Sequence, residues 1–149
     1  MDENLKQYLD RITVSLEEGA LWHKKAANEC RNFGVRGLGR WHDCEAAGDF
    51  ETLVCLEKLL GDNVNYYKTS RPELDVVSGV NIRNQQELKA HFASWRNREL
   101  VTTDAIASAI PLMREENIEL YEKLCCIQKE IQNEIVSVLR VHDSFEFAG

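Results

Sequence analysis

Apolar residues recur every three or four positions along most of the chain, which is the spacing of one face of an α-helix. The pattern predicts helices over about residues 5–31 and 38–60, and a third from about 84 to Pro111. A last apolar stripe from Leu120 to Val138 predicts a fourth helix, followed by a tail at residues 144–147. The chain is therefore predicted to be all-α, a four-helix bundle.

Local signals indicate where these helices begin and end. Gly34 lies in a short segment with a second glycine, which suits a helix C-cap and a tight reversal. The first two helices are then antiparallel neighbours. Asn84 followed by Glu87 has the spacing of a helix N-cap, and Pro111 is expected to kink or end the third helix.

The segment from about 61 to 84 breaks any helical period with asparagine, serine, glycine and proline residues. A connection of this length inside a compact domain needs a structural reason. Parallel second and third helices supply one, because the chain must then return along the whole bundle. One long crossover is typical of ferritin-like bundles. We therefore expect a single domain over residues 1–149 with up-down-down-up helices and a crossover at about 61–84.

Net charge, the length of apolar runs and cysteine spacing limit the partners and the cellular location that we expect for this chain. The formal charge is −7, which disfavours nucleic acid as a partner because phosphates are bound mainly by lysine and arginine. No run of eighteen apolar residues is present, and the first residues lack the pattern of a secretory signal, so we expect a cytoplasmic protein without a membrane partner. The five cysteines have no CxxC spacing, and we expect reduced thiols that act as small buried hydrophobes.

Several carboxylates fall within or beside the apolar stripes. Glu45 and Asp49 lie in the middle of the stripe of the second helix, and Glu99 lies among large hydrophobes of the third. Glu18 on the first helix and Glu130 on the fourth lie beside their stripes. A buried carboxylate is unfavourable unless it is paired, hydrogen-bonded or bound to a metal. Inward carboxylates from four helices are typical of di-iron bundle sites.

Two alternatives stay open for these residues. The carboxylates could instead form salt bridges or lie on the edge of a stripe, in contact with water. Glu17 and Glu134 also compete with Glu18 and Glu130 for the same roles, because the helical period leaves the phase of each stripe uncertain by about one position.

The stretch from Glu18 to Leu60 resembles the first helical hairpin of the ferritin and bacterioferritin family, with Asn32-Phe33-Gly34 at the turn. The segment from Glu99 to Ile106, a glutamate followed by apolar and threonine positions, is similar to the third helix of that family. The resemblance implies a homo-oligomer with a role in iron homeostasis, and it implies metal ligands at four positions. These positions are Glu18 (or Glu17), Asp49, Glu99 and Glu130.

The chain also departs from the family pattern. Thr52 and Asn133 stand where the family has ligand histidines, and Asp49 is shorter than the usual glutamate. The resemblance therefore implies weak binding of iron or another divalent metal and an impaired ferroxidase centre, with no catalytic residue assigned. Phe50 stands at the position of the haem methionine, so no haem is expected.

Three hypotheses follow. The first is a ferritin-like protein that binds divalent metal weakly as a homo-oligomer. The second is a non-catalytic bundle that serves as a protein-interaction scaffold, since two histidines are missing. The third is an oxidase with a rearranged two-metal site that uses His23 or His42, whereas His91 and His142 show no partner pattern.

Overall fold

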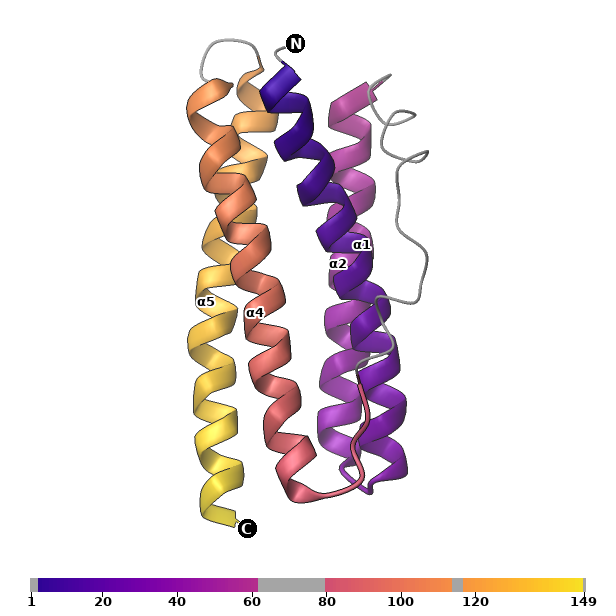
Figure 1. Ribbon diagram of the computed structural model, residues 1–149. Coiled ribbons are helices and arrows are strands. Elements are labelled where there is room, and N and C mark those ends of the chain that lie inside the picture. The colour runs from indigo at the N-terminus through magenta and orange to yellow at the C-terminus, as the bar shows by residue number, and fades with distance from the viewer. Residues whose placement is uncertain (1–2, 62–79, 114–116, 149) are drawn as a thin grey trace.

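The computed structural model describes residues 3–61, 80–113 and 117–148 of the chain, and these residues form helices and turns without any strand (Figure 1). The elements in chain order are α1 (Glu3–Asn32), α2 (Arg36–Leu60), α4 (Gln85–Ala109), the 3₁₀ turn η3 (Ile110–Leu112) and α5 (Ile118–Ala148). The all-α prediction is confirmed. The predicted tail at residues 144–147 is corrected, because α5 continues through it.

The turn between α1 and α2 has the geometry that its glycine predicts. Gly34 has a φ of 92°, in the left-handed region that favours glycine. The Val35 N–H donates to the carbonyl of Cys30 at 2.8 Å, and the Gly34 N–H donates to the carbonyl of Arg31 at 3.0 Å. This pair of bonds is a Schellman motif, which closes α1 and turns the chain back along it as α2.

The boundaries of α4 also follow from its sequence. The side-chain oxygen of Asn84 accepts a hydrogen bond from the Glu87 N–H at 2.8 Å, so the predicted N-cap is confirmed. At the other end α4 stops at Ala109, and Pro111 lies in the 3₁₀ turn that follows. Proline lacks an N–H for the α-helical bond, which accounts for the change of helix type.

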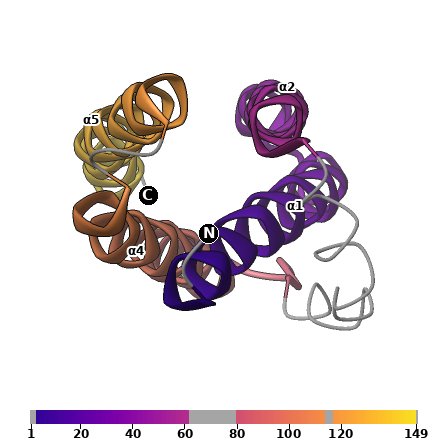
Figure 2. The ribbon, with the colours of Figure 1, turned by 90° about the horizontal axis from the view of Figure 1, so that it is seen from above.

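The four helices pack around one interior (Figure 2). Each contacts two neighbours, in the order α1, α2, α5, α4 and back to α1, with the most extensive packing between α1 and α2 and the least between α2 and α5. Residues 62–79 lie outside the described part of the chain, and most of the predicted crossover falls on them. No helix among the described residues is long and apolar enough to cross a membrane.

The core consists of two apolar clusters separated by a polar layer. The first cluster lies toward the start of α1 and includes Leu9, Leu56 and Leu124, all fully buried. The second lies toward the turn between α1 and α2 and includes Trp22, Leu38 and Trp95. Full burial of one large apolar side chain contributes about 1.5–3 kcal/mol, so the two clusters can support a less favourable layer between them.

Candidate metal centre

The polar layer brings together side chains from three helices. His23 of α1, Asp49 of α2 and Glu99 of α4 each offer a ligand atom, and these three atoms lie within 4.8 Å of one another. The His23 Nε2 atom is 3.9 Å from the Asp49 Oδ2 atom. A single cation could therefore be reached by all three side chains after small rotations.

Helical spacing explains why these side chains point inward. His23 follows the buried Leu16 by seven residues, which is two helical turns. Glu99 lies four residues after the buried Trp95 and has only 9 % of its surface exposed. A carboxylate at that position is carried into the interior by its hydrophobic neighbours on α4.

A glycine on α1 makes room for the Asp49 carboxylate. A Cβ atom placed on Gly19 would lie 3.2 Å from the Asp49 Oδ2 atom, which is closer than nine in ten real Cβ contacts. A larger residue at this position would require the carboxylate to shift by a few tenths of an ångström. The missing side chain of Gly19 thus leaves room for the Asp49 carboxylate in the polar layer. This has an energetic cost, because a glycine inside a helix is less favourable than alanine by about 1 kcal/mol.

Two further carboxylates extend the cluster to the fourth helix. Glu45 of α2 and Glu134 of α5 are hydrogen-bonded to each other through their side chains. Both line a pocket of about 110 Å³ between α2 and α5, together with Asp49. Two carboxyl groups can form such a bond only when one of them carries a proton. Glu130 also lines this pocket, which therefore has four carboxyl groups around it, those of Glu45, Asp49, Glu130 and Glu134.

Burial and mutual repulsion raise the pKa values of these groups. Burial first, and then the charges of Glu99, Glu134 and Glu45, raise the pKa of Asp49 to about 9. Burial and the Glu45 charge raise the pKa of Glu99 to about 7. The pKa of Glu134 rises to about 8, again mainly through burial and then through Glu45 and Glu99. Much of the cluster is therefore protonated at neutral pH, because burial and the charges of neighbouring carboxylates dominate these pKa values among the described residues.

A chain of three buried imidazoles begins at His23. The Trp95 Nε1–H donates to His23 Nε2 at 3.2 Å, and His23 Nδ1 is 2.9 Å from His42 Nδ1. His42 Nε2 is 3.0 Å from His91 Nε2, and His91 Nδ1 contacts the backbone carbonyl of Leu88. These contacts join α1, α2 and α4 beside the carboxylate cluster.

The two ends of the chain fix the tautomer of each imidazole. The indole nitrogen can only donate, so His23 Nε2 is an acceptor and the His23 proton is on Nδ1. That proton is donated to His42 Nδ1, which places the His42 proton on Nε2. His42 then donates to His91 Nε2, and His91 donates its Nδ1–H to a carbonyl that can only accept. Every contact is satisfied when all three rings are neutral.

Burial keeps His23 and His42 neutral. It lowers the pKa of His23 to about 3 and that of His42 to about 2, with neighbouring histidines adding to the effect. Neutral imidazole is the form that binds metal ions.

Of the four sequence-predicted ligands, the structure brings two together. Asp49 and Glu99 lie beside His23. Glu18 instead forms an ion pair with Arg98 at 3.9 Å, at a partly exposed position. Glu130 is exposed and lines the same pocket as Asp49. Its neighbour along the helix, Glu134, is the α5 carboxylate in contact with the cluster.

The structure also shows where Thr52, Asn133 and the cysteines lie. Thr52, at the position of a family histidine, lines the acidic pocket, whereas Asn133 is exposed. Only Cys30 among the cysteines is buried, so the expectation of buried thiols is wrong for Cys44, Cys55 and Cys126.

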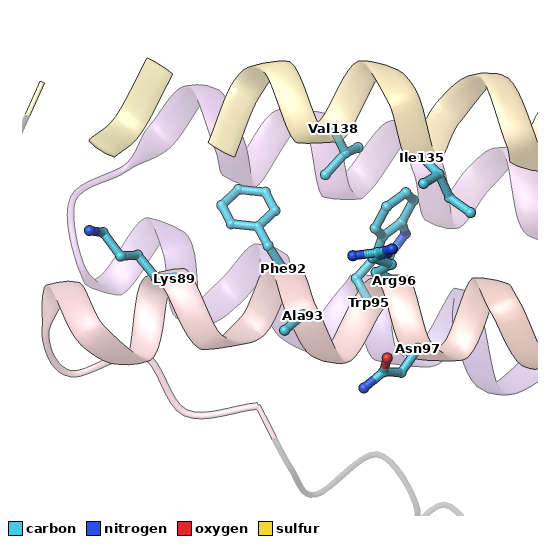
Figure 3. Close-up of a pocket in the computed structure, with 8 residues that line it drawn as sticks. All are labelled: Lys89, Phe92, Ala93, Trp95, Arg96, Asn97, Ile135 and Val138. Atoms are coloured by element: carbon cyan, nitrogen blue, oxygen red, sulfur yellow. The ribbon is translucent and has the colours of Figure 1, made fainter. Parts of the chain in front are cut away.

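A second pocket lies between α4 and α5, with Trp95 in its lining. It has a volume of about 190 Å³, and Figure 3 shows Phe92 and Trp95 of α4 facing Ile135 and Val138 of α5. Lys89 and Arg96 add positive charge at its edge. The described residues that line it include no carboxylate, imidazole or thiol, so we do not assign it to the metal centre.

Comparison with protein-family models gave no match for this chain. A search for similar curated proteins gave none either. The function is therefore inferred from the positions of the side chains in the polar layer and from their ability to bind metal ions. The described residues hold groups suited to a metal ion, namely the His23, Asp49 and Glu99 group and a second group around Cys30.

Proposed function

We propose that this protein binds one or two divalent cations, iron(II) or manganese(II), at the acidic layer of its helical bundle. The observation that carries the proposal is the clustering of Asp49 and Glu99 with His23, and of Asp49 with Glu45 and Glu134, inside the bundle, where burial and mutual repulsion raise the carboxyl pKa values. A dication would replace protons on these carboxyl groups and offset the repulsion between the carboxylates.

The ligand types favour a hard or borderline metal ion. Carboxylate oxygens with one imidazole suit iron(II) and manganese(II), whereas a thiolate-rich site would suit softer ions. Asp49 and Glu99 would hold the first cation with His23, and Glu45 and Glu134 lie where they could complete this site or hold a second cation. His23 must release its bond from Trp95 in order to bind metal, so the carboxylates would provide most of the binding energy.

A ferritin-like assignment is part of the same proposal. The resemblance of the hairpin from Glu18 to Leu60 supports it, and so does Figure 1, which draws α2 and α4 running in the same direction. Parallel second and third helices require a crossover along the bundle, as in ferritin-like folds. In this proposal iron is a cargo that the protein holds, and assembly into a homo-oligomer is the expected context.

The test is metal analysis of the anaerobic protein after incubation with iron(II) or manganese(II), with removal of unbound metal and light scattering to give the size of the assembly. We expect about one or two metal ions per chain, because the carboxylate cluster offers donors for that number. The Glu99→Gln variant should retain much less metal, because it replaces an ionisable ligand by an amide of similar shape.

The matched control is Glu51→Gln, since Glu51 is an exposed carboxylate on α2. Metal retained by the control and lost from the Glu99 variant supports the proposal. Absence of bound metal in the wild type, together with a small oligomer, contradicts it and favours the alternative of a protein-interaction scaffold.

A further inference from the structure

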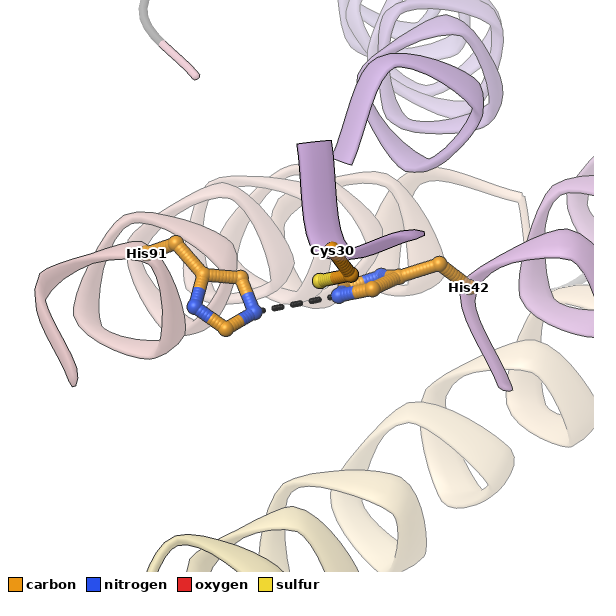
Figure 4. A group of neighbouring side chains, drawn as sticks. All are labelled: Cys30, His42 and His91. Carbon is orange, nitrogen blue, oxygen red and sulfur yellow. Dashed lines mark hydrogen bonds between the residues drawn. The ribbon is translucent and has the colours of Figure 1, made fainter. Parts of the chain in front are cut away.

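A second group of metal-ligating side chains lies beyond His23, away from the acidic pocket. Cys30 of α1, His42 of α2 and His91 of α4 place a thiol and two imidazoles together (Figure 4), with their ligand atoms within 4.8 Å of one another. All three side chains are buried, with exposed fractions of 0 %, 0 % and 5 %. The proposed acidic site uses none of them.

The spacing of the two imidazoles suits a shared metal ion. Their Nε2 atoms are 3.0 Å apart. Two nitrogen ligands at about 2.0 Å on a tetrahedral ion lie about 3.3 Å from each other, so the observed separation is within a few tenths of an ångström. The Cys30 Sγ atom lies within 4.8 Å of a ring nitrogen of each histidine and would approach by about 1 Å to reach an ordinary metal–sulfur distance.

The surroundings of His91 orient it as a ligand. Its Nδ1–H is held by the carbonyl of Leu88, which leaves the Nε2 lone pair directed at His42. A backbone carbonyl on the far nitrogen is a common way to orient metal-binding histidines. The Trp22 ring stacks on His91 with a centroid distance of 6.1 Å and so covers it with an apolar surface.

We propose that Cys30, His42 and His91 bind a thiophilic metal ion, copper(I) or zinc(II). A thiolate with two imidazoles is a ligand set for such ions. Copper(I) ranks first of the two, because one thiolate neutralises its single charge and leaves no net charge in this buried site. Zinc(II) would leave one positive charge there and ordinarily takes a fourth ligand.

An access route to the site is present at the protein surface. His91 lines a pocket of about 230 Å³ that is also lined by Asn81, Arg83 and Glu87. Asn81, Arg83 and Ser94 are exposed, so this pocket meets solvent at the beginning of α4. An ion would therefore reach His91 first, and then His42 and Cys30.

Binding at this site changes the hydrogen bonds of the imidazole chain. The ion displaces the Cys30 thiol proton to solvent and takes the place of the proton on His42 Nε2. His42 then carries its proton on Nδ1 and donates to His23, and the His23 proton moves to Nε2, which faces the Asp49 Oδ2 atom at 3.9 Å. The hydrogen bond that Trp95 Nε1–H donates to this nitrogen in the metal-free protein is then broken. Because His23 Nε2 is then protonated, it cannot serve as a ligand of the acidic site.

The experiment uses a variant that keeps Cys30 as its sole cysteine. The other four, Cys44, Cys55, Cys125 and Cys126, are exposed or partly exposed and are replaced by serine, so that they cannot bind the ion. The anaerobic full-length variant is titrated with copper(I) in competition with a coloured copper(I) chelator, and separately with zinc(II). X-ray absorption spectroscopy then identifies the atoms around the bound ion.

We expect one ion per chain with one sulfur and two nitrogen neighbours. Adding Cys30→Ser to the same background should lower the affinity at least tenfold, while Glu51→Gln in that background, which changes an exposed carboxylate of α2, should leave it unchanged. If the Cys30→Ser variant does not fold, the X-ray absorption spectrum of the Cys30-only protein still tests the proposal, because it shows whether sulfur and nitrogen surround the ion. Failure to bind either ion, or an ion surrounded by oxygen alone, overturns the proposal without affecting the acidic site.

Discussion

Replacing Asp49 by asparagine should stabilise the metal-free protein, and the gain should grow with pH. In the folded state burial and neighbouring carboxylates raise the pKa of Asp49 from 3.8 to about 9. Between these two values the folded protein keeps a proton that the unfolded chain has released. The free energy of unfolding of the wild type therefore falls as pH rises from about 4 to about 9. Asparagine has no proton to lose, so this decline disappears.

The size of the effect follows from proton linkage. Each pH unit within that window changes the free energy of unfolding by about 1.4 kcal/mol for one fully protonated group. The gain from Asp49→Asn should therefore increase by up to about 3 kcal/mol between pH 6 and pH 8. For a chain of this length, that difference corresponds to a change in Tm of about 5–10 °C.

The assay is chemical and thermal unfolding at pH 6 and pH 8, in buffers that contain a chelator to keep metal away. The Asp104→Asn variant is the control, because Asp104 is an exposed aspartate on α4 and its replacement should give the same small change at both values. Adding manganese(II) without chelator should raise the Tm of the wild type and leave that of Asp49→Asn nearly unchanged.

One result would refute this reasoning about the acidic layer. If Asp49→Asn destabilises the metal-free protein more at pH 8 than at pH 6, the native carboxylate is ionised and stabilised by a partner. The protein would then have no unbalanced negative charge for a cation to offset.

Three other predictions follow from the same contacts. Metal binding at pH 7 should release about two protons per chain, because Asp49 and Glu134 have pKa values of about 9 and 8; calorimetry in buffers with different ionisation enthalpies measures this number. Gly19→Ala should weaken manganese(II) binding, because the Asp49 carboxylate must shift by a few tenths of an ångström to admit the new Cβ, while Gly37→Ala, where a Cβ meets nothing, should not. Nitrogen NMR of the metal-free protein should find His23 protonated at Nδ1 and His42 at Nε2, with neither ring titrating between pH 5 and pH 8; protonation of either ring in that range would contradict the hydrogen-bond chain.

The sequence predicted the helices well, because each carries a long apolar stripe with a recognisable cap or breaker. Gly34, Asn84 and Pro111 each have one local function that does not depend on the rest of the fold. The end of α5 was misjudged, since the polar residues near 144 do not stop a helix by themselves.

The candidate site was harder to predict because it depends on the phase of each stripe. On α5 the buried residues 120, 124, 127, 131 and 138 follow alternating steps of four and three, and this pattern includes Glu134 rather than Glu130. On α2 the same reasoning selects His42, which is fully buried, over Trp41. A shift of one residue along a helix rotates a side chain by about 100°, enough to exchange these pairs.

The contacts between histidines could not be inferred from one sequence. His91 lies on the Leu88 and Trp95 stripe of α4, so its burial was predictable, but its partner is His42 on another helix. This contact depends on how far α2 and α4 are shifted along the bundle axis relative to each other, which is set by the packing of the whole bundle. The close approach of Asp49 to Gly19 depends in the same way on the relative position of α1 and α2.

A crystal structure of the protein soaked with manganese(II), with anomalous scattering recorded at the manganese edge, would locate the bound cation. We expect an anomalous peak within coordination distance of the Asp49 and Glu99 carboxylates, with His23 or Glu134 completing the ligands. A map without a peak in this layer, or with peaks confined to Glu18 or to surface carboxylates, would contradict the proposed metal centre.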